Sequence, residues 1–138
     1  MAAEVKFEDN RIQVKNAMHN KMLAVLEECA GELESQVKRN TRVDTGQTKN
    51  SWGHIVTVNN GEYVGMVGSS QQNAIWEEFG TGEHALANNG RKGGWHYKDA
   101  KGKWHYTTGK KPSRALHNAW ASLKNKIISR IQNSFKGL

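Results

Sequence analysis

The chain has 138 residues, a single cysteine and a formal net charge of +7 at pH 7. This length suits one domain, residues 1–138, with a modest core. A lone cysteine, Cys29, excludes an internal disulfide and a cysteine zinc cluster. No apolar run approaches the roughly 20 residues that span a bilayer, so we expect a soluble protein made in the cytoplasm.

The basic residues are concentrated towards the C-terminal end. Residues 91–114 carry eight Lys and Arg and one acid, Asp99, whereas residues 1–90 carry eight Lys and Arg and twelve Asp and Glu. Such a basic zone is attracted to phosphates or to an acidic protein surface, and charge alone does not separate the two.

A long amphipathic helix is predicted from about Asn10. Its apolar residues recur at steps of three and four: Ile12, Met18, Met22, Val25, Leu26, Cys29, Leu33 and Val37. Asp9 or Asn10 is a candidate cap for its start. Lys38 and Arg39 suit the negative end of the helix dipole. The stripe also predicts that the Cys29 thiol is buried.

A short helical turn is predicted next, because Asp44 and Gln47 have the spacing of a capping box, with Gly46 between them. The triplet Asp44-Thr-Gly also matches half of an aspartic protease site. That chemistry needs two carboxylates that share a proton, and the polar residues after this single triplet argue against it.

Residues 52–69 are predicted to form a β-hairpin. Asn60-Gly61 is a strong two-residue turn signal, so Ile55 should face Met66 across the strands. The two faces of the hairpin differ little in apolarity. We therefore expect its outer face to be covered as well, by another subunit in our interpretation.

The chain is organised around the stretch Ala74-Ile-Trp-Glu-Glu-Phe-Gly-Thr-Gly82. We interpret Trp76 and Phe79, with Ile75, as anchors at a buried edge. Gly80 and Gly82 would release the backbone into a shaped loop. The pattern alone indicates packing and not chemistry.

Residues 83–111 are predicted to form a projecting basic loop that contains a second hairpin. Its strands would be the near-repeats 95–98 and 104–107, joined by a turn at residues 99–102. The expected pairs are Trp95 with Tyr106, Tyr97 with Trp104, and His96 with His105. Opposed histidines could contribute to a metal site, but no nearby cysteine or carboxylate has the right spacing, so we expect no metal.

This loop is instead predicted to be an interface with a neighbouring subunit or partner. The candidate interface residues are Trp76, Phe79, Arg91, Lys92, Trp95, Tyr97, Lys101, Lys103, Trp104 and Tyr106. Stacking of these aromatic rings on bases is the alternative, which would make the chain a nucleic-acid-binding protein acting through residues 91–138. A nuclease with His96 or His105 as general base would need a second acid or a metal, for which we find no candidate.

A last helix is predicted after Pro112, with Ser113 as its candidate cap and an apolar stripe of Leu116, Ala119, Trp120, Leu123, Ile127, Ile131 and Phe135. The predicted fold class is α+β: a long N-terminal helix, a small antiparallel sheet with a projecting β-hairpin, and a C-terminal helix packed on the sheet. The chain has no βαβ crossover, phosphate-cradling glycine loop or nucleophile elbow, so we expect neither an enzyme nor a bound cofactor.

Several blocks of the sequence, taken together, resemble a known family. They are Asp44-Thr-Gly, Lys49-Asn-Ser51, Val67-Gly-Ser69, the stretch 74–82, and Lys111-Pro-Ser-Arg-Ala-Leu116 before a terminal helix. In this order and spacing they are similar to the tail-component family of tailed bacteriophages that includes the tail-completion protein of HK97-like phages. The resemblance covers most of the chain after about residue 40.

The resemblance implies a non-enzymatic virion protein of the neck or tail, assembled in the host cytoplasm. Such a protein would form a ring between the head connector and the tail tube or tail terminator. By the same resemblance we expect a homo-oligomer of six copies, with twelve as the alternative. The loop 83–111 would then reach a neighbouring ring or the packaged DNA.

Overall fold

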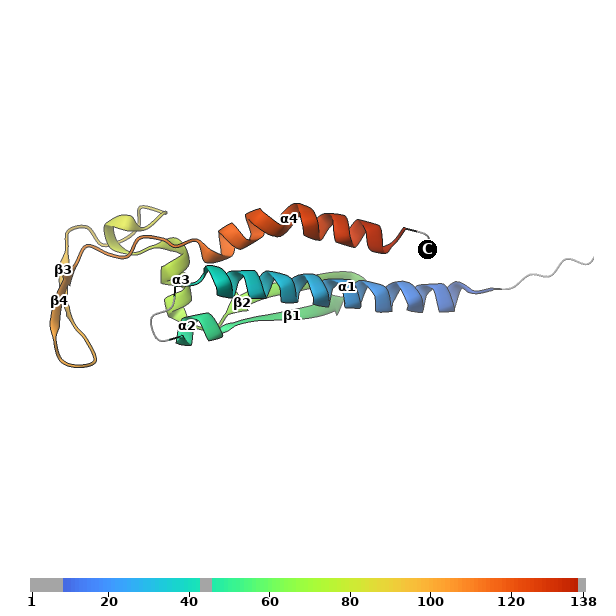
Figure 1. The fold of residues 1–138 in the computed structure, drawn as a ribbon, viewed down its shortest axis with the longest axis horizontal. Coiled ribbons are helices and arrows are strands. Elements are labelled where there is room, and N and C mark those ends of the chain that lie inside the picture. The colour runs from blue at the N-terminus through green and yellow to red at the C-terminus, as the bar shows by residue number, and fades with distance from the viewer. Residues whose placement is uncertain (1–8, 43–45, 137–138) are drawn as a thin grey trace, which may run out of the picture.

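The computed structural model describes residues 9–42 and 46–136, and it confirms the α+β class (Figure 1). The elements in chain order are α1 (Arg11–Asn40), α2 (Gln47–Asn50), β1 (Trp52–Asn59), β2 (Glu62–Ser69), α3 (Gln72–Phe79), a 3-10 turn η1 (Gly82–His84), β3 (Trp95–Lys98), β4 (Trp104–Thr107) and α4 (Ala115–Ser134). The short turn α2 is confirmed. Its expected capping partner, Asp44, lies outside the described residues.

Helix α1 is the central element, with α4 on one side and the β1–β2 hairpin on the other (Figure 1). We expected α4 to lie across the sheet beside the first helix. It lies beside α1, as expected, and its start also reaches Trp52 of β1. A two-stranded sheet has little area to offer, and α1 already covers one of its faces. One core cluster joins α1 to the start of α4 through Val37, Trp52 and Ala119, and a second joins the middles of both helices through Val25, Cys29 and Ile127.

The ends of α1 follow the expected signals in part. Asn10 occupies the N-cap position without a side-chain hydrogen bond, and Asp9 instead accepts one from the backbone N–H of Arg11 at 3.2 Å. Lys38 and Arg39 lie in the last turn, as predicted. Cys29 is buried, as predicted, and its burial raises the pKa of the thiol.

Ion pairs line the seam between α1 and α4. Glu32 of α1 accepts hydrogen bonds from Lys126 Nζ at 2.8 Å and from Arg130 at 2.6 Å. The contact with Lys126 is the main reason that the pKa of Glu32 is lowered. These pairs lie beside the second core cluster, and because they are partly exposed each contributes only modestly to stability.

The β1–β2 hairpin has the predicted register, with Ile55 opposite Met66 and the turn at Asn60-Gly61. On its inner face, the His54 ring lies over Gly31 of α1, 3.6 Å from the position that a Cβ would occupy. On its outer face, Ile55 and Met66 are exposed. The outer apolar face is therefore uncovered in the single chain.

Our prediction that Trp76 and Phe79 are anchors at a buried edge was wrong. Residues 72–79 form helix α3, and its large apolar side chains face outward: Trp76 is 46% exposed and Phe79 is 52% exposed. The buried face carries Ala74 and Glu78, which is 5% exposed. A helix turns residues four apart to one side, so the charged Glu78 lies inside and the aromatic residues lie outside.

Candidate functional site: the arm and its base

The arm, residues 80–113, projects from the end of the molecule opposite the start of α1 and the end of α4 (Figure 1). Its two backbone segments are joined at the base by reciprocal hydrogen bonds. The Thr81 N–H donates to the carbonyl of Lys110 at 2.9 Å, and the Lys110 N–H donates to Thr81 Oγ1 at 2.8 Å. Glu83 N–H extends this ladder to the carbonyl of Thr108 at 2.9 Å. The two segments of the arm are therefore held together at its base by these hydrogen bonds.

Glycines make this close pairing of segments possible. Gly82 has φ +60°, and a Cβ on it would lie 2.3 Å from the Thr108 carbonyl oxygen. Gly80 has φ +78°, and a Cβ there would lie 2.9 Å from Pro112 Cδ. Both distances are shorter than real Cβ contacts, and both backbone conformations disfavour other residues. Three residues that we predicted to be structural thus lie at the base of the arm: Gly80, Gly82 and Pro112. The fourth, Gly46, lies elsewhere, at the start of α2, where it has φ +81°.

Glu77 connects the body to the returning segment of the arm. Its carboxylate accepts hydrogen bonds from Arg42 at 2.9 Å and from Lys110 Nζ at 2.5 Å. Burial alone would raise the pKa of Glu77, but Lys110 and Arg42 outweigh burial and the pKa is lowered. The backbone carbonyl of Glu77 also accepts the Ser113 N–H at 2.6 Å.

Glu78 caps helix α4, a role that we assigned to Ser113. Its carboxylate accepts the backbone N–H groups of Leu116 at 2.9 Å and His117 at 3.0 Å. These N–H groups belong to the first turn of α4, where no earlier carbonyl can pair with them. Ser113 Oγ instead donates to the Glu77 carbonyl at 3.1 Å. Once residues 72–79 are known to be helical, the i, i+4 spacing from Ala74 puts Glu78 on the same, buried face of α3.

The hairpin of the arm is shifted by one residue from the predicted register. Tyr97 pairs with His105, and Lys98 pairs with Trp104, so His96 and His105 are not opposed. The shift comes from the loop that Asp99 closes: its Oδ1 accepts both the Lys101 and the Lys103 N–H at 2.9 Å. The predicted pairing of the two histidines was wrong.

The aromatic residues predicted for the interface differ in exposure. Trp104 is 65% exposed and Tyr106 is 62% exposed, and Tyr97 is also exposed. Trp95 is partly buried against the base, near Gly82. The predicted basic residues Arg91, Lys92, Lys101 and Lys103 are all exposed. The arm therefore presents aromatic and basic side chains together.

A second apolar surface lies on the outer side of α3. Trp76 and Phe79 line a groove with Ile75, Leu86 and residues 80–82, 85, 87, 89 and 90. The Arg114 guanidinium lies 5.5 Å from the centre of the Phe79 ring. The two predicted residues of the 74–82 stretch thus share one open apolar surface at the foot of the arm.

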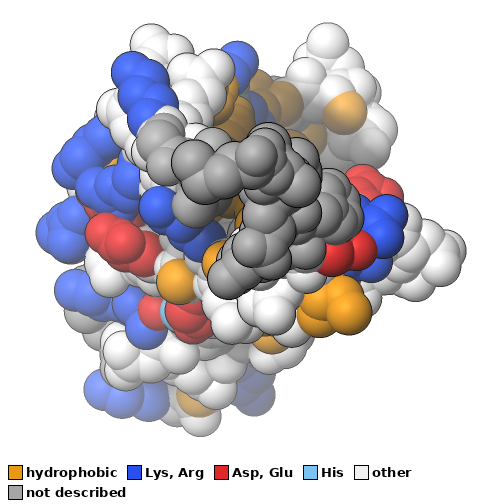
Figure 2. All heavy atoms as spheres, turned by 90° about the vertical axis from the view of Figure 1, so that its right-hand side faces the viewer, with side chains coloured by type: hydrophobic (Ala, Val, Ile, Leu, Met, Phe, Trp, Pro, Cys, Tyr) orange, Lys and Arg blue, Asp and Glu red, His pale blue; other side chains and the backbone are white. Residues whose placement is uncertain are grey.

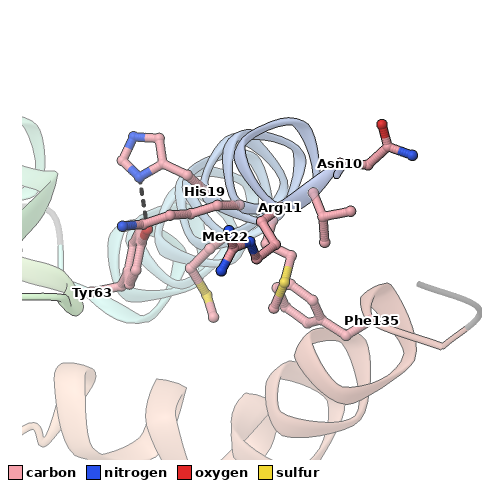
Figure 3. A pocket seen from close by; sticks show the side chains of 9 residues that line it. Asn10, Arg11, His19, Met22, Tyr63 and Phe135 are labelled. Carbon is pink, nitrogen blue, oxygen red and sulfur yellow. Dashed lines mark hydrogen bonds between the residues drawn. The ribbon is translucent and has the colours of Figure 1, made fainter. Parts of the chain in front are cut away.

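A third apolar surface lies at the opposite end, between the start of α1 and the end of α4 (Figure 3). Met22 and Phe135 point into this groove, and Tyr63 reaches it from β2, where its hydroxyl lies 2.7 Å from His19 Nδ1. Figure 2 shows that Lys and Arg side chains gather along one side of this end.

Some of the separate sequence blocks of the resemblance contact one another: the hydroxyls of Ser51 and Ser69 are 2.5 Å apart, and the Leu116 N–H donates to Glu78. Next to two of these blocks, Asn73 Nδ2 donates to Thr48 Oγ1 at 2.9 Å. Across residues 9–42 and 46–136, no three His, Cys, Asp or Glu side chains are grouped so that they could hold a metal ion. None of the described helices has both the length and the apolarity that a bilayer crossing requires.

One family model matches residues 6–80, and its description reads "Bacteriophage HK97-gp10, putative tail-component". No curated protein and no solved structure matches the chain. The matched range ends at Gly80, where the arm begins, so it covers the body up to the end of α3.

Proposed function

Because the chain belongs to the HK97-gp10-like family of phage tail components, we propose that it completes the phage neck as a ring between head connector and tail tube. A tail component is a structural protein of the virion, so we expect this chain to contact other phage structural proteins. The ring would consist of identical copies, six by our expectation and twelve as the alternative, and its role would be non-enzymatic. The whole chain, residues 1–138, would act as one domain with residues 83–111 projecting from it.

The observation that carries this proposal is the open apolar surface formed by Trp76 and Phe79. Both side chains are about half exposed although they lie next to Gly80 and Gly82, where the backbone packs closely at the base of the arm. Exposed apolar patches of this kind mark contact sites between proteins. A second copy is the occupant that we propose, because a head-to-tail contact that repeats around an axis closes a ring.

The outer face of the β1–β2 hairpin supports the same arrangement. Ile55 and Met66 are exposed there, beside the Gly53–Gly68 pair, which offers no side chains. A ring contact is heterologous, so each copy must offer two different surfaces. The α3 groove and this sheet face lie on different parts of the chain and could fill the two roles.

The test is the mass of the purified protein, measured by light scattering over a concentration series. We expect a discrete hexamer, or a dodecamer, for the unmodified chain and its loss in Trp76→Ala and Phe79→Ala, with circular dichroism unchanged. Trp120→Ala, which removes an exposed tryptophan from α4, is the matched control and should assemble normally. A chain that stays monomeric at every concentration, also when head-connector and tail-tube proteins are added, would contradict the proposal.

A further inference from the structure

Five cations of the arm, all between residues 91 and 103, have no carboxylate partner within the described part of the chain. They are Arg91, Lys92, Lys98, Lys101 and Lys103, and none of them takes part in an ion pair there. Lys110, at the base of the arm, is paired with Glu77. On α1 and α4, by contrast, Lys126 and Arg130 are paired with Glu32. The arm therefore keeps its positive charge available for a partner.

Asp99, the one acid among residues 91–114, is used inside the hairpin. Asp99 Oδ1 accepts the Lys101 and Lys103 backbone N–H groups, and its Oδ2 lies 2.7 Å from His105 Nε2. The carboxylate organises the loop and leaves the Lys101 and Lys103 ammonium groups directed to solvent. Three lysines, Lys98, Lys101 and Lys103, thus lie around the short turn of this hairpin.

Two exposed rings lie on the same face of this hairpin as one of these lysines. Trp104 and Tyr106 are two residues apart on β4, so their side chains lie on one face, about 7 Å apart along the strand. Lys98, directly opposite Trp104, belongs to the same face, and its Nζ lies 5.9 Å from the centre of the Trp104 ring. A positive charge therefore flanks an open aromatic surface.

We propose that the arm tip, residues 95–107, is a binding site for single-stranded nucleic acid. Lys98, Lys101 and Lys103 contact phosphates, and Trp104 and Tyr106 stack on bases. Proteins that bind single strands combine these two elements, a cationic path for the backbone and aromatic rings for the bases. The site acts in each copy by itself, so this inference stands apart from ring formation.

The rings distinguish this ligand from the two nearest alternatives. An acidic protein surface would form ion pairs with the lysines, but it would offer no flat group to stack on the exposed rings of Trp104 and Tyr106. A duplex would present phosphates, but its bases are stacked on one another and its grooves expose only their edges. A single strand offers phosphates and free base faces together.

The experiment is fluorescence anisotropy of the full chain with a labelled oligothymidylate of about 16 nucleotides, over a series of salt concentrations. The triple variant Lys98→Gln, Lys101→Gln, Lys103→Gln should bind roughly tenfold or more weakly, and its log–log salt slope should be smaller by about 2. The matched control carries Lys15→Gln, Lys21→Gln and Lys124→Gln, which remove the same charge from exposed, unpaired lysines outside the arm. This control should retain most of the affinity.

A second pair of variants tests the stacking. Trp104→Ala should lower the affinity for the single strand roughly fivefold or more, whereas Trp120→Ala should not. Equal losses in the two lysine triples would overturn the site, and so would competition by poly-glutamate as strong as by the oligonucleotide. Equal binding of a duplex, with no effect of Trp104→Ala, would also overturn it. Light scattering on the same samples reports assembly separately, so a failed ring and a failed binding site give different results.

Discussion

The buried carboxylate of Glu78 accepts the backbone N–H of Leu116 at 2.9 Å, 38 residues further along the chain. This bond joins the end of α3 to the first turn of α4, across the whole length of the arm. The residues between them can project from the body because their two ends are fixed to each other here.

Replacing Glu78 with Ala should therefore destabilise the protein by about 2–4 kcal/mol. The change removes a helix cap and leaves the Leu116 and His117 N–H groups without their acceptor. Urea denaturation measures this loss. Glu78→Gln keeps one acceptor oxygen and should lose about half as much, and an unchanged midpoint for both variants would contradict the capping role.

Replacing Gly82 with Ala should loosen the base of the arm. The new methyl group would meet the Thr108 carbonyl oxygen, and the left-handed backbone adds strain, together about 3 kcal/mol. Hydrogen exchange should show loss of protection at Glu83 and in β3 and β4, with α1 unchanged. The control is Gly68→Ala, where no atom lies within 4 Å of the added Cβ; equal effects in both variants would refute this role of Gly82.

Glu77→Gln should destabilise the protein at neutral pH and have less effect in acid. The folded pKa of Glu77 is lowered, so its contribution is present above the unfolded pKa of about 4.3 and is lost as the pH falls through the folded pKa. Its partners Arg42 and Lys110 are half exposed, which limits the contribution to about 1 kcal/mol. Urea midpoints of both proteins at pH 7 and pH 3 measure it, and a constant difference would argue against the ion pairs.

His54 should have the opposite pH dependence. Its pKa is raised, mainly by the hydrogen bond to Glu27 and also by Glu34, although burial opposes this. Its contribution is therefore present below the unfolded pKa of about 6.5 and is lost as the pH rises through the folded pKa. The stability difference between the unmodified chain and His54→Gln should be larger at pH 5.5 than at pH 9. A stability difference that is the same at both pH values would contradict this role of His54.

Local signals in the sequence predicted the elements well. Asn60-Gly61 predicted the register of the first hairpin correctly, because a two-residue turn allows only one pairing of the two strands. In the arm, the same reasoning missed by one residue. Asp99 binds two backbone N–H groups of its own loop, and Gly102 takes φ +82°, which lengthens the turn. The hydrogen bonds of the Asp99 side chain thus determine how β3 and β4 pair.

The role of Glu78 could not be predicted from nearby residues. A charged side chain between Trp76 and Phe79 suggests a surface position, and its true partners are backbone groups of a helix far along the chain. Burial of that carboxylate depends on where α4 begins, which is set by tertiary packing. For the same reason Ser113, which has the residue type of a cap, does not act as one.

The hydrogen bonds between Thr81 and Lys110 bring the two ends of the arm to the same place on the body. Because this segment leaves and returns at one point, its length and sequence can change without altering the backbone of the rest of the protein. Shortening or replacing residues 84–107 should then leave α1, α4 and the first hairpin folded.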